Sequence, residues 1–167
     1  MIQVYTGEGK GKTTAAIGLA VRAAGAGKRV YICQFLKKGM FSELKALKKI
    51  KGITCRQFGS GNFCKRPPAQ KDMLMAKQGL ESAIRAIRSK RYDVVILDEL
   101  NIALSLSVLR LNEVVRIFEQ LPSSVELVIT GRKAHPKIIK LADLVSEIKE
   151  LKHYFKTGTK AREGIEY

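Results

Sequence analysis

The sequence has no tryptophan, four prolines and three cysteines among 167 residues, and its 15 acidic residues face 31 basic ones. The cysteines (Cys33, Cys55 and Cys64) are odd in number and form no Cys-x-x-Cys pair, so the sequence supports neither a disulfide framework nor a zinc knuckle. No apolar run approaches the ~18 residues that a membrane-spanning helix needs. Because hydrophobic residues make up 46% of the chain, collagen-like and wholly disordered proteins are excluded as well.

The amino-terminal residues contain no recognisable targeting segment. Residues 1–5 lead directly into a glycine-rich loop, which leaves no room for a signal peptide. The sequence therefore predicts a cytoplasmic protein that does not associate with a membrane.

The excess of lysine and arginine gives a formal net charge of +16. Such a charge favours an anionic partner, which can be a nucleotide, a nucleic acid, or a small molecule rich in carboxylates or phosphates. A solvated basic surface that serves solubility explains the same lysines equally well. Aromatic residues make up only 7% of the chain, which argues against single-stranded nucleic acid, because proteins that bind it stack the bases on aromatic side chains.

Short apolar runs alternate with amphipathic helical patterns along the whole chain. Apolar residues at i, i+3, i+4 and i+7 predict helices that contain residues 80–87 and 111–118, and another helix is expected over residues 12–24. Strands are expected at residues 2–5, 29–35, 53–58, 94–97, 125–130 and 144–148. Alternating strands and helices are typical of βαβ units. The sequence therefore predicts one three-layer α/β domain over residues 1–167 with a mostly parallel sheet.

A glycine-rich loop joins the first expected strand to the first expected helix. It consists of Thr6, Gly7, Glu8, Gly9, Lys10, Gly11, Lys12, Thr13 and Thr14. Glycines let backbone N–H groups turn inward toward an anion, and the helix N-terminus adds partial positive charge. Lys12 is placed to reach the outer phosphates, and Thr13 to ligate Mg²⁺. The strict phosphate-loop pattern has glycine where this chain has Thr6, so the loop is a variant that still predicts ATP binding and P-loop NTPase (RecA-like) architecture.

Two acidic residues, Asp98 and Glu99, follow the apolar run at residues 94–97. Acids at the carboxyl end of a buried strand lie beside the phosphate loop, where both can hold Mg²⁺ directly or through water. Glu99 can also polarise a water, and the alternative is that both acids only cap the next turn. Arg132 follows the strand at residues 125–130 and is either a contact for a phosphate or carboxylate, or a surface residue.

Residues 59–71 form the main irregular segment of the chain, with two glycines and two prolines. A segment of this length inside a compact domain is more often a binding loop or a lid than an idle connection. We therefore expect this loop to contribute to ligand binding.

Seven short segments form a combined pattern that is more specific than any one motif. They are residues 6–16 (TGEGKGKTTAA), 34–37 (QFLK), 97–104 (LDELNIAL), 130–132 (TGR), 151–155 (LKHYF), 160–162 (KAR) and 164–167 (GIEY). Together they resemble the corrinoid (cobalamin) adenosyltransferases of the P-loop type, over nearly the whole chain. The LDELNIAL string and the carboxyl-terminal ending are far more specific than the phosphate loop alone.

The resemblance implies a reaction in adenosylcobalamin synthesis, in which a Co(I) corrinoid attacks the 5′-carbon of ATP and expels triphosphate. It implies that Lys12, Thr13 and Glu99 are catalytic, and that Arg132 and the phosphate loop bind ATP. Thr13 with Asp98 or Glu99 would hold Mg²⁺. The cations around the phosphates would neutralise the charge that grows on the leaving triphosphate.

The resemblance also assigns residues to the corrinoid, which is cobalamin or a precursor. Phe63 matches a phenylalanine that presses under the corrin ring, where apolar side chains displace the lower axial ligand and ease reduction to Co(I). Asn101, in the LDELNIAL string, is the second corrinoid residue. Phe63 is equally compatible with a core position. Relatives often carry a tryptophan two residues after it, where this chain has Lys65.

A homodimer and a flavoprotein reductant are further implications of the resemblance. Three other functions stay open: a RecA-like nucleic-acid-binding ATPase, favoured by the charge of +16; a small-molecule kinase that releases ADP; and a non-catalytic corrinoid carrier. Release of triphosphate instead of ADP distinguishes the transferase from the first two. Tight corrinoid binding without adenosylation would indicate the carrier.

Overall fold

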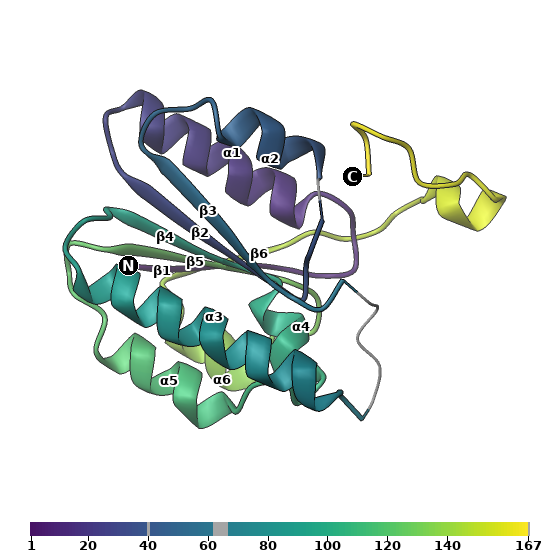
Figure 1. Ribbon diagram of the computed structural model, residues 1–167. Coiled ribbons are helices and arrows are strands. Elements are labelled where there is room, and N and C mark those ends of the chain that lie inside the picture. The colour runs from purple at the N-terminus through teal and green to yellow at the C-terminus, as the bar shows by residue number, and fades with distance from the viewer. Residues whose placement is uncertain (40, 62–66, 167) are drawn as a thin grey trace.

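The computed structural model describes residues 1–39, 41–61 and 67–166, which form a six-stranded parallel sheet between two layers of helices (Figure 1). The strands are β1 (Ile2–Thr6), β2 (Val30–Phe35), β3 (Ile53–Phe58), β4 (Val94–Asp98), β5 (Glu126–Thr130) and β6 (Leu144–Glu147). Their spatial order is β3-β2-β4-β5-β1-β6, and each pair of neighbours is parallel. The predicted three-layer α/β class is confirmed.

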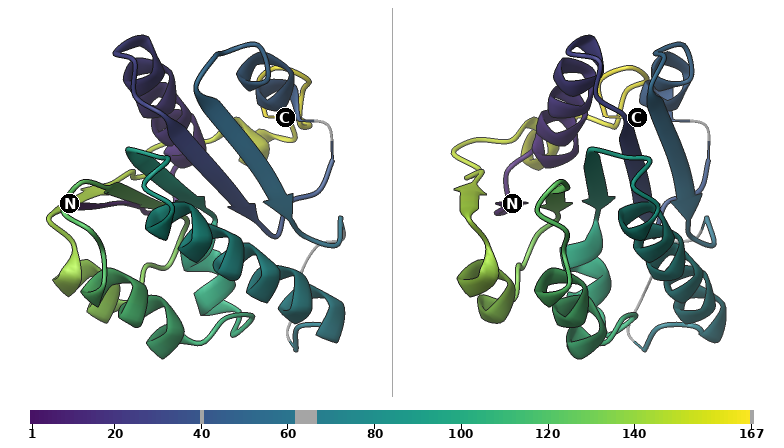
Figure 2. Two further views of the ribbon diagram at one scale, coloured as in Figure 1. Left: turned by 60° about the vertical axis from the view of Figure 1, so that its left-hand side comes forward. Right: turned by 90° about the vertical axis from the view of Figure 1, so that its left-hand side faces the viewer.

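The helices divide unequally between the two faces of the sheet. They are α1 (Lys12–Gly25), α2 (Ser42–Leu47), α3 (Gln70–Arg88), α4 (Leu100–Ser105), α5 (Leu111–Glu119) and α6 (Pro136–Leu141), with a 3₁₀ turn, η1 (Tyr154–Thr157), near the carboxyl end. Figure 1 shows α1 and α2 on one face and the other four α-helices on the opposite face, and Figure 2 shows the same layers from two further directions.

The central strand β4 shows why the sheet needs both helical layers. Val94 and Ile96 pack into the core cluster under α1, whereas Val95 and Leu97 pack into the larger cluster on the other face. Because successive side chains of a strand point to opposite faces, a continuous apolar run is what a strand covered on both sides requires.

Three short helices were not apparent in the sequence. Helices α2, α4 and α6 have six residues each, which is too short for an apolar period to stand out. The irregular segment at residues 59–71 is also shorter than expected at its far end, since α3 already begins at Gln70. Residues 62–66 of this segment lie outside the described residues.

The strand order determines where a site can form. Strand β5 lies between β1 and β4, so the phosphate loop and the acidic strand end are separated by one strand. All three strands are parallel, and their carboxyl ends meet at one edge of the sheet, where ligands bind in such folds. Among the described residues, no helix is both long and apolar enough to cross a membrane.

Candidate nucleotide and corrinoid site

The phosphate loop packs tightly against the chain that follows β6. A Cβ atom on Gly7 or Gly9 would collide with the carbonyl oxygen of Ile148. Gly7 and Gly11 also have φ values of 97° and 115°, in the left-handed region that favours glycine. The glycines are therefore needed for close approach and for backbone conformation, independently of any ligand.

One amide of the loop differs from the sequence-based expectation. The N–H of Gly9 donates a 2.8 Å hydrogen bond to the Ile148 carbonyl, so it does not turn inward toward an anion. The physical reason is the strand neighbour: β6 pairs with β1, and the chain continues past the loop with the Ile148 N–H bound to the Thr6 carbonyl. The edge strand β6 thus places Ile148 where it holds the phosphate loop by a backbone hydrogen bond.

Lys12 begins α1 and is buried, with its ammonium group folded back onto the carbonyl of Gly9. Burial lowers the pKa of Lys12, and the nearby charge of Arg132 lowers it further, while Glu99 and Glu8 act in the opposite direction. An anion that binds beside such a buried ammonium group stabilises its charged form. The position of Lys12 thus fits the predicted role in binding phosphates.

Asp98, at the end of β4, accepts hydrogen bonds from four side chains. Oδ1 accepts from the hydroxyls of Thr13 (2.8 Å) and Thr130 (2.7 Å), whereas Oδ2 accepts from Lys37 Nζ (2.8 Å) and Gln34 Nε2 (3.1 Å). Burial opposes the charge of Lys37, but the attraction and hydrogen bond of Asp98 outweigh it and raise the Lys37 pKa. The carboxylate joins the ends of β2, β4 and β5 to the start of α1.

Glu99 differs from its neighbour Asp98 in its hydrogen bonding. Its backbone is left-handed (φ 63°) at the start of α4, and its N–H donates to the Thr130 hydroxyl at 3.0 Å. Its carboxylate accepts no hydrogen bond from the residues that the structure describes. Burial raises the pKa of Glu99, and the negative charge of Asp98 raises it further. Glu99 is the carboxylate that is free to meet a ligand.

The other predicted site residues lie in different surroundings. Arg132 lies beside the phosphate loop, where it forms an exposed 3.2 Å ion pair with Glu8. Asn101 is fully buried and its amide donates to the Gly131 carbonyl at 3.1 Å, so its side chain supports the turn before Arg132 and lines neither cavity described below. Phe63 and its neighbour Lys65 lie outside the described residues.

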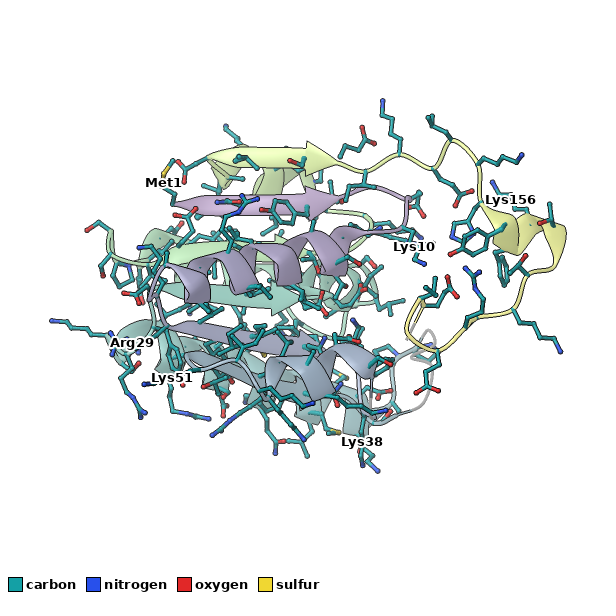
Figure 3. All side chains as sticks on the ribbon, turned by 90° about the horizontal axis from the view of Figure 1, so that it is seen from above. Met1, Lys10, Arg29, Lys38, Lys51 and Lys156 are labelled. Carbon is teal, nitrogen blue, oxygen red and sulfur yellow. The ribbon has the colours of Figure 1, made fainter. Side chains whose placement is uncertain are left out.

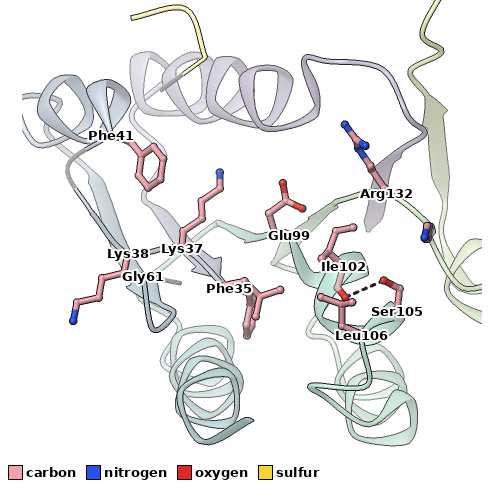
Figure 4. Close-up of a pocket in the computed structure, with 12 residues that line it drawn as sticks. Phe35, Lys37, Lys38, Phe41, Gly61, Glu99, Ile102, Ser105, Leu106 and Arg132 are labelled. Atoms are coloured by element: carbon pink, nitrogen blue, oxygen red, sulfur yellow. Dashed lines mark hydrogen bonds between the residues drawn. The ribbon is translucent and has the colours of Figure 1, made fainter. Parts of the chain in front are cut away.

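Two cavities meet at the carboxyl edge of the sheet. One, of about 680 Å³, is lined by residues 9–14 of the phosphate loop, and the other, of about 580 Å³, is lined by apolar side chains of β2 and α4. Four residues line both: Lys37, Phe41, Glu99 and Arg132. Figure 4 shows the charged ends of Lys37, Glu99 and Arg132 pointing to the same side, toward α1, away from Ile102 and Leu106.

Sequence reasoning missed several residues at this site. Gln34, Lys37 and Thr130 were noted only as parts of motifs, yet all three bind Asp98. The carboxyl-terminal residues His153, Gly164, Ile165 and Glu166 line the cavity beside the phosphate loop. Their only signal in the sequence was the specific ending of the chain, which gave no location.

Comparison with known proteins decides between the functions that the geometry leaves open. The sequence model of the family described as ATP:corrinoid adenosyltransferase BtuR/CobO/CobP matches residues 1–167. The chain belongs to this family. The corrinoid adenosyltransferases of Escherichia coli K12 and of a Sinorhizobium species are each 37% identical to it, with all of this chain aligned to 85% and 80% of theirs. The corrinoid adenosyltransferase CobA of Salmonella typhimurium is 36% identical, over all of this chain and 85% of its own length. Membership of the adenosyltransferase family confirms the resemblance that the motifs indicated.

Proposed function

We propose that this protein transfers the 5′-deoxyadenosyl group of ATP to the cobalt of a reduced corrinoid and releases triphosphate. The observation that carries the proposal is the junction of the two cavities at Lys37, Phe41, Glu99 and Arg132. One cavity is lined by the glycines and cations of a phosphate loop, and the other is mostly apolar. A reaction between a nucleotide and a large macrocycle needs such a pair of cavities, open to each other where the bond forms.

The phosphate loop would bind the group that leaves. Lys12 and Arg132 would neutralise negative charge as it grows on the departing triphosphate, and Lys10 would add a further cation at the mouth. The hydroxyls of Thr13 and Thr14 line the same cavity. Because Co(I) attacks with its own electron pair and has no proton to lose, no general base is needed, which agrees with a site whose only histidine is His153 among the described lining residues.

The donor set beside the loop fits Mg²⁺, which takes oxygen ligands and commonly uses one or two carboxylates together with substrate phosphates. The Thr13 hydroxyl lies 2.8 Å from Asp98, and Glu99 has an unengaged carboxylate in the same cavity. Because Asp98 already accepts four hydrogen bonds, we assign direct ligation to Glu99 and Thr13, and contact through water to Asp98. When bound, Mg²⁺ would neutralise charge on the phosphates.

The apolar cavity would receive the corrinoid. Phe35, Leu36, Ile102 and Leu106 are among its apolar lining residues, and Gly61 places the start of the 59–71 loop at its wall. An apolar wall excludes water from the cobalt and favours a cobalt that has lost its lower ligand. Phe63 remains the predicted residue beneath the ring, and the flavoprotein reductant and the homodimer remain predictions.

The proposed step balances without a proton donor or acceptor. The electron pair of Co(I) forms the cobalt–carbon bond, which formally oxidises the metal to Co(III). The bond between C5′ and its phosphate oxygen breaks, and its electron pair leaves with the triphosphate. The protein's part is to align cobalt, C5′ and the leaving oxygen, and to stabilise the negative charge.

The test is an anaerobic incubation of the protein with ATP, Mg²⁺ and chemically reduced Co(I) cobalamin. We expect the absorption spectrum of an alkylated corrinoid and one triphosphate for each product formed. Release of ADP and phosphate would instead support the nucleic-acid ATPase, and release of ADP without free phosphate would support the kinase. Corrinoid binding without any product would support the carrier.

Lys12→Ala is the first variant for this assay, with the exposed Lys28→Ala as its control. Loss of a buried cation from the leaving-group site should lower turnover by about 10²-fold or more, as removal of one preorganised electrostatic contact does elsewhere. The control should retain full activity. Unchanged rates in Lys12→Ala would contradict the proposed role of the loop.

A further inference from the structure

The carboxyl-terminal segment at residues 150–166 folds over the mouth of the phosphate loop. In Figure 3 it lies beyond the carboxyl ends of the strands, opposite Lys10. Gly164, Ile165 and Glu166 line the nucleotide cavity together with the loop itself. This segment therefore forms a wall of the cavity.

A compact network fastens the segment to Lys10. The Lys10 ammonium donates to Glu166 Oε1 at 2.7 Å and to the Tyr154 hydroxyl at 2.8 Å, and that hydroxyl donates in turn to Glu166. Arg162 donates to Glu166 from its backbone N–H at 2.7 Å and from its guanidinium group at 3.3 Å. The Tyr154 ring also lies 5.6 Å from the Lys10 ammonium and 4.9 Å from the Arg162 guanidinium carbon.

Glu166 is the residue on which the network depends. It contacts Lys10, Tyr154 and Arg162, and these partners hold the pKa of its carboxyl well below the ordinary range, Arg162 most strongly. Two cations around one carboxylate leave net positive charge at the mouth. A lysine ammonium has three donors, and two of those on Lys10 are used here, which leaves one for a phosphate oxygen.

Elsewhere the segment is weakly held. Leu151 is 96% exposed and Phe155 is 74% exposed, and the ion pair between Glu163 and Lys45 spans 3.5 Å between two exposed side chains. Without the contacts to Lys10, little in the described structure keeps the segment over the loop. The contacts with Lys10 therefore determine whether the segment closes this side of the cavity.

We propose that residues 150–166 form a closing wall of the nucleotide site, and that Glu166 is a positioning residue that fastens this wall to Lys10. The inference rests on the proposed function, because it takes the cavity to be the site for the triphosphate of ATP. Lys10 then has two roles, which are to anchor the segment and to present its remaining N–H to a phosphate. The wall retains the nucleotide while the corrinoid binds on the other side of the junction.

The test measures the affinity for ATP with Mg²⁺ by calorimetry, in the absence of corrinoid, for Glu166→Ala, Lys10→Ala and the double variant. Loss of a charged hydrogen-bond network should weaken ATP binding about tenfold in Glu166→Ala. Lys10→Ala should weaken it at least as much, and the double variant no more than Lys10→Ala alone. Glu163→Ala removes a carboxylate from the same segment and should bind ATP with the wild-type affinity. The KM of Glu166→Ala for the corrinoid should equal that of the wild type.

Tryptic cleavage gives a second readout that does not depend on affinity. The segment contains Lys152, Lys156 and Lys160, and ATP should slow cleavage after them in the wild type but not in Glu166→Ala or in Tyr154→Phe. Losses that multiply in the double variant would overturn the proposal, because Lys10 and Glu166 would then act separately. Tighter ATP binding by Glu166→Ala would overturn it too, since Glu166 would be a competitor. A wild type that binds no ATP at all would instead refute the proposed function.

Discussion

Asp98 and Glu99 are adjacent in the sequence, yet they meet opposite conditions in the structure. Asp98 accepts four hydrogen bonds, two of them from threonine hydroxyls, and is 1% exposed. Glu99 accepts none from the described residues, and both its burial and its neighbour raise its pKa. A carboxylate kept without partners costs stability, which is typical of a residue held for a ligand.

Glu99→Gln should therefore stabilise the protein at neutral pH while it removes most of the activity. The folded state raises the pKa of Glu99 above its ordinary value, so folding favours the protonated form. The wild type therefore loses stability as the pH rises from the ordinary pKa of a glutamate through the raised pKa of the folded state. We therefore expect the variant to have a higher free energy of unfolding and a higher melting temperature than the wild type near pH 7. Calorimetric melting across pH measures both.

The same experiment carries its own control. At a pH below the ordinary pKa of a glutamate, the wild-type side chain is already neutral, so the two proteins should melt at nearly the same temperature. Turnover with Co(I) cobalamin should fall by about 10²-fold, since Glu99 is the assigned magnesium ligand. A variant that is less stable than the wild type at pH 7 would contradict this account of Glu99.

At the scale of the element, the two long helices α1 and α3 each contain an interior glycine in a different environment. A Cβ on Gly18 of α1 would meet nothing within 4 Å, whereas a Cβ on Gly79 of α3 would lie 3.0 Å from the rings of Phe35 and Phe58. Gly79 thus lets α3 approach β2 and β3 closely, and Gly18 has no such packing role.

Substitution of each glycine by alanine should move stability in opposite directions. Gly18→Ala should stabilise by about 0.5–1 kcal/mol, because alanine loses less backbone entropy in a helix. Gly79→Ala has the same helical gain but must displace the buried ring of Phe35 and the half-buried ring of Phe58, and such overpacking costs ~1–3 kcal/mol, so we expect a net loss of about 1 kcal/mol. Urea unfolding measures both changes in the free energy of unfolding, provided that the slope of this free energy against urea concentration is the same for each variant. Equal effects at the two sites would show that helix propensity alone matters.

The sequence predicted the elements that carry a strong periodic signal. The strand β4 is a run of apolar residues that only a doubly covered strand accommodates, and α3 and α5 each repeat their apolar residues over two turns. Helices of six residues are too short to show a helical period of apolar residues, and tertiary contacts determine whether they form. Thus α4 begins at Leu100, directly after Glu99, whose left-handed backbone is not visible in the residue type.

At the scale of the whole molecule, the site could be predicted only in part, because most of its contacts join distant residues. The phosphate loop and Asp98 were found from local motifs. The hydrogen bond between Lys10 and Tyr154 crosses 144 positions of the chain, and the support of Gly9 by Ile148 depends on the pairing of β6 with β1. No local pattern encodes such pairings, which follow from the strand order.

The net charge of +16 is also spread over the whole molecule, so its effect on ATP binding depends on position. Lys51 lies at the opposite end of the sheet from Lys10 (Figure 3). The six residues of β3 that separate that end from the carboxyl edge span roughly 20 Å, at ~3.3 Å per residue. This is more than twice the Debye length of about 8 Å at physiological ionic strength. Arg132, in contrast, lines both cavities.

Lys51→Glu and Arg132→Glu change the net charge by the same two units, and they should differ in their effect on the KM for ATP. At ~0.15 M salt, we expect Arg132→Glu to raise this KM about tenfold or more and Lys51→Glu to change it by less than about twofold, because screening leaves only the near charge effective. At ~0.01 M salt the Debye length grows to about 30 Å, and Lys51→Glu should then raise the KM as well. Steady-state kinetics at the two salt concentrations measure both effects. If the two variants raised the KM equally at physiological salt, the basic surface as a whole would attract the nucleotide, and the cations of the site would have no special part in it.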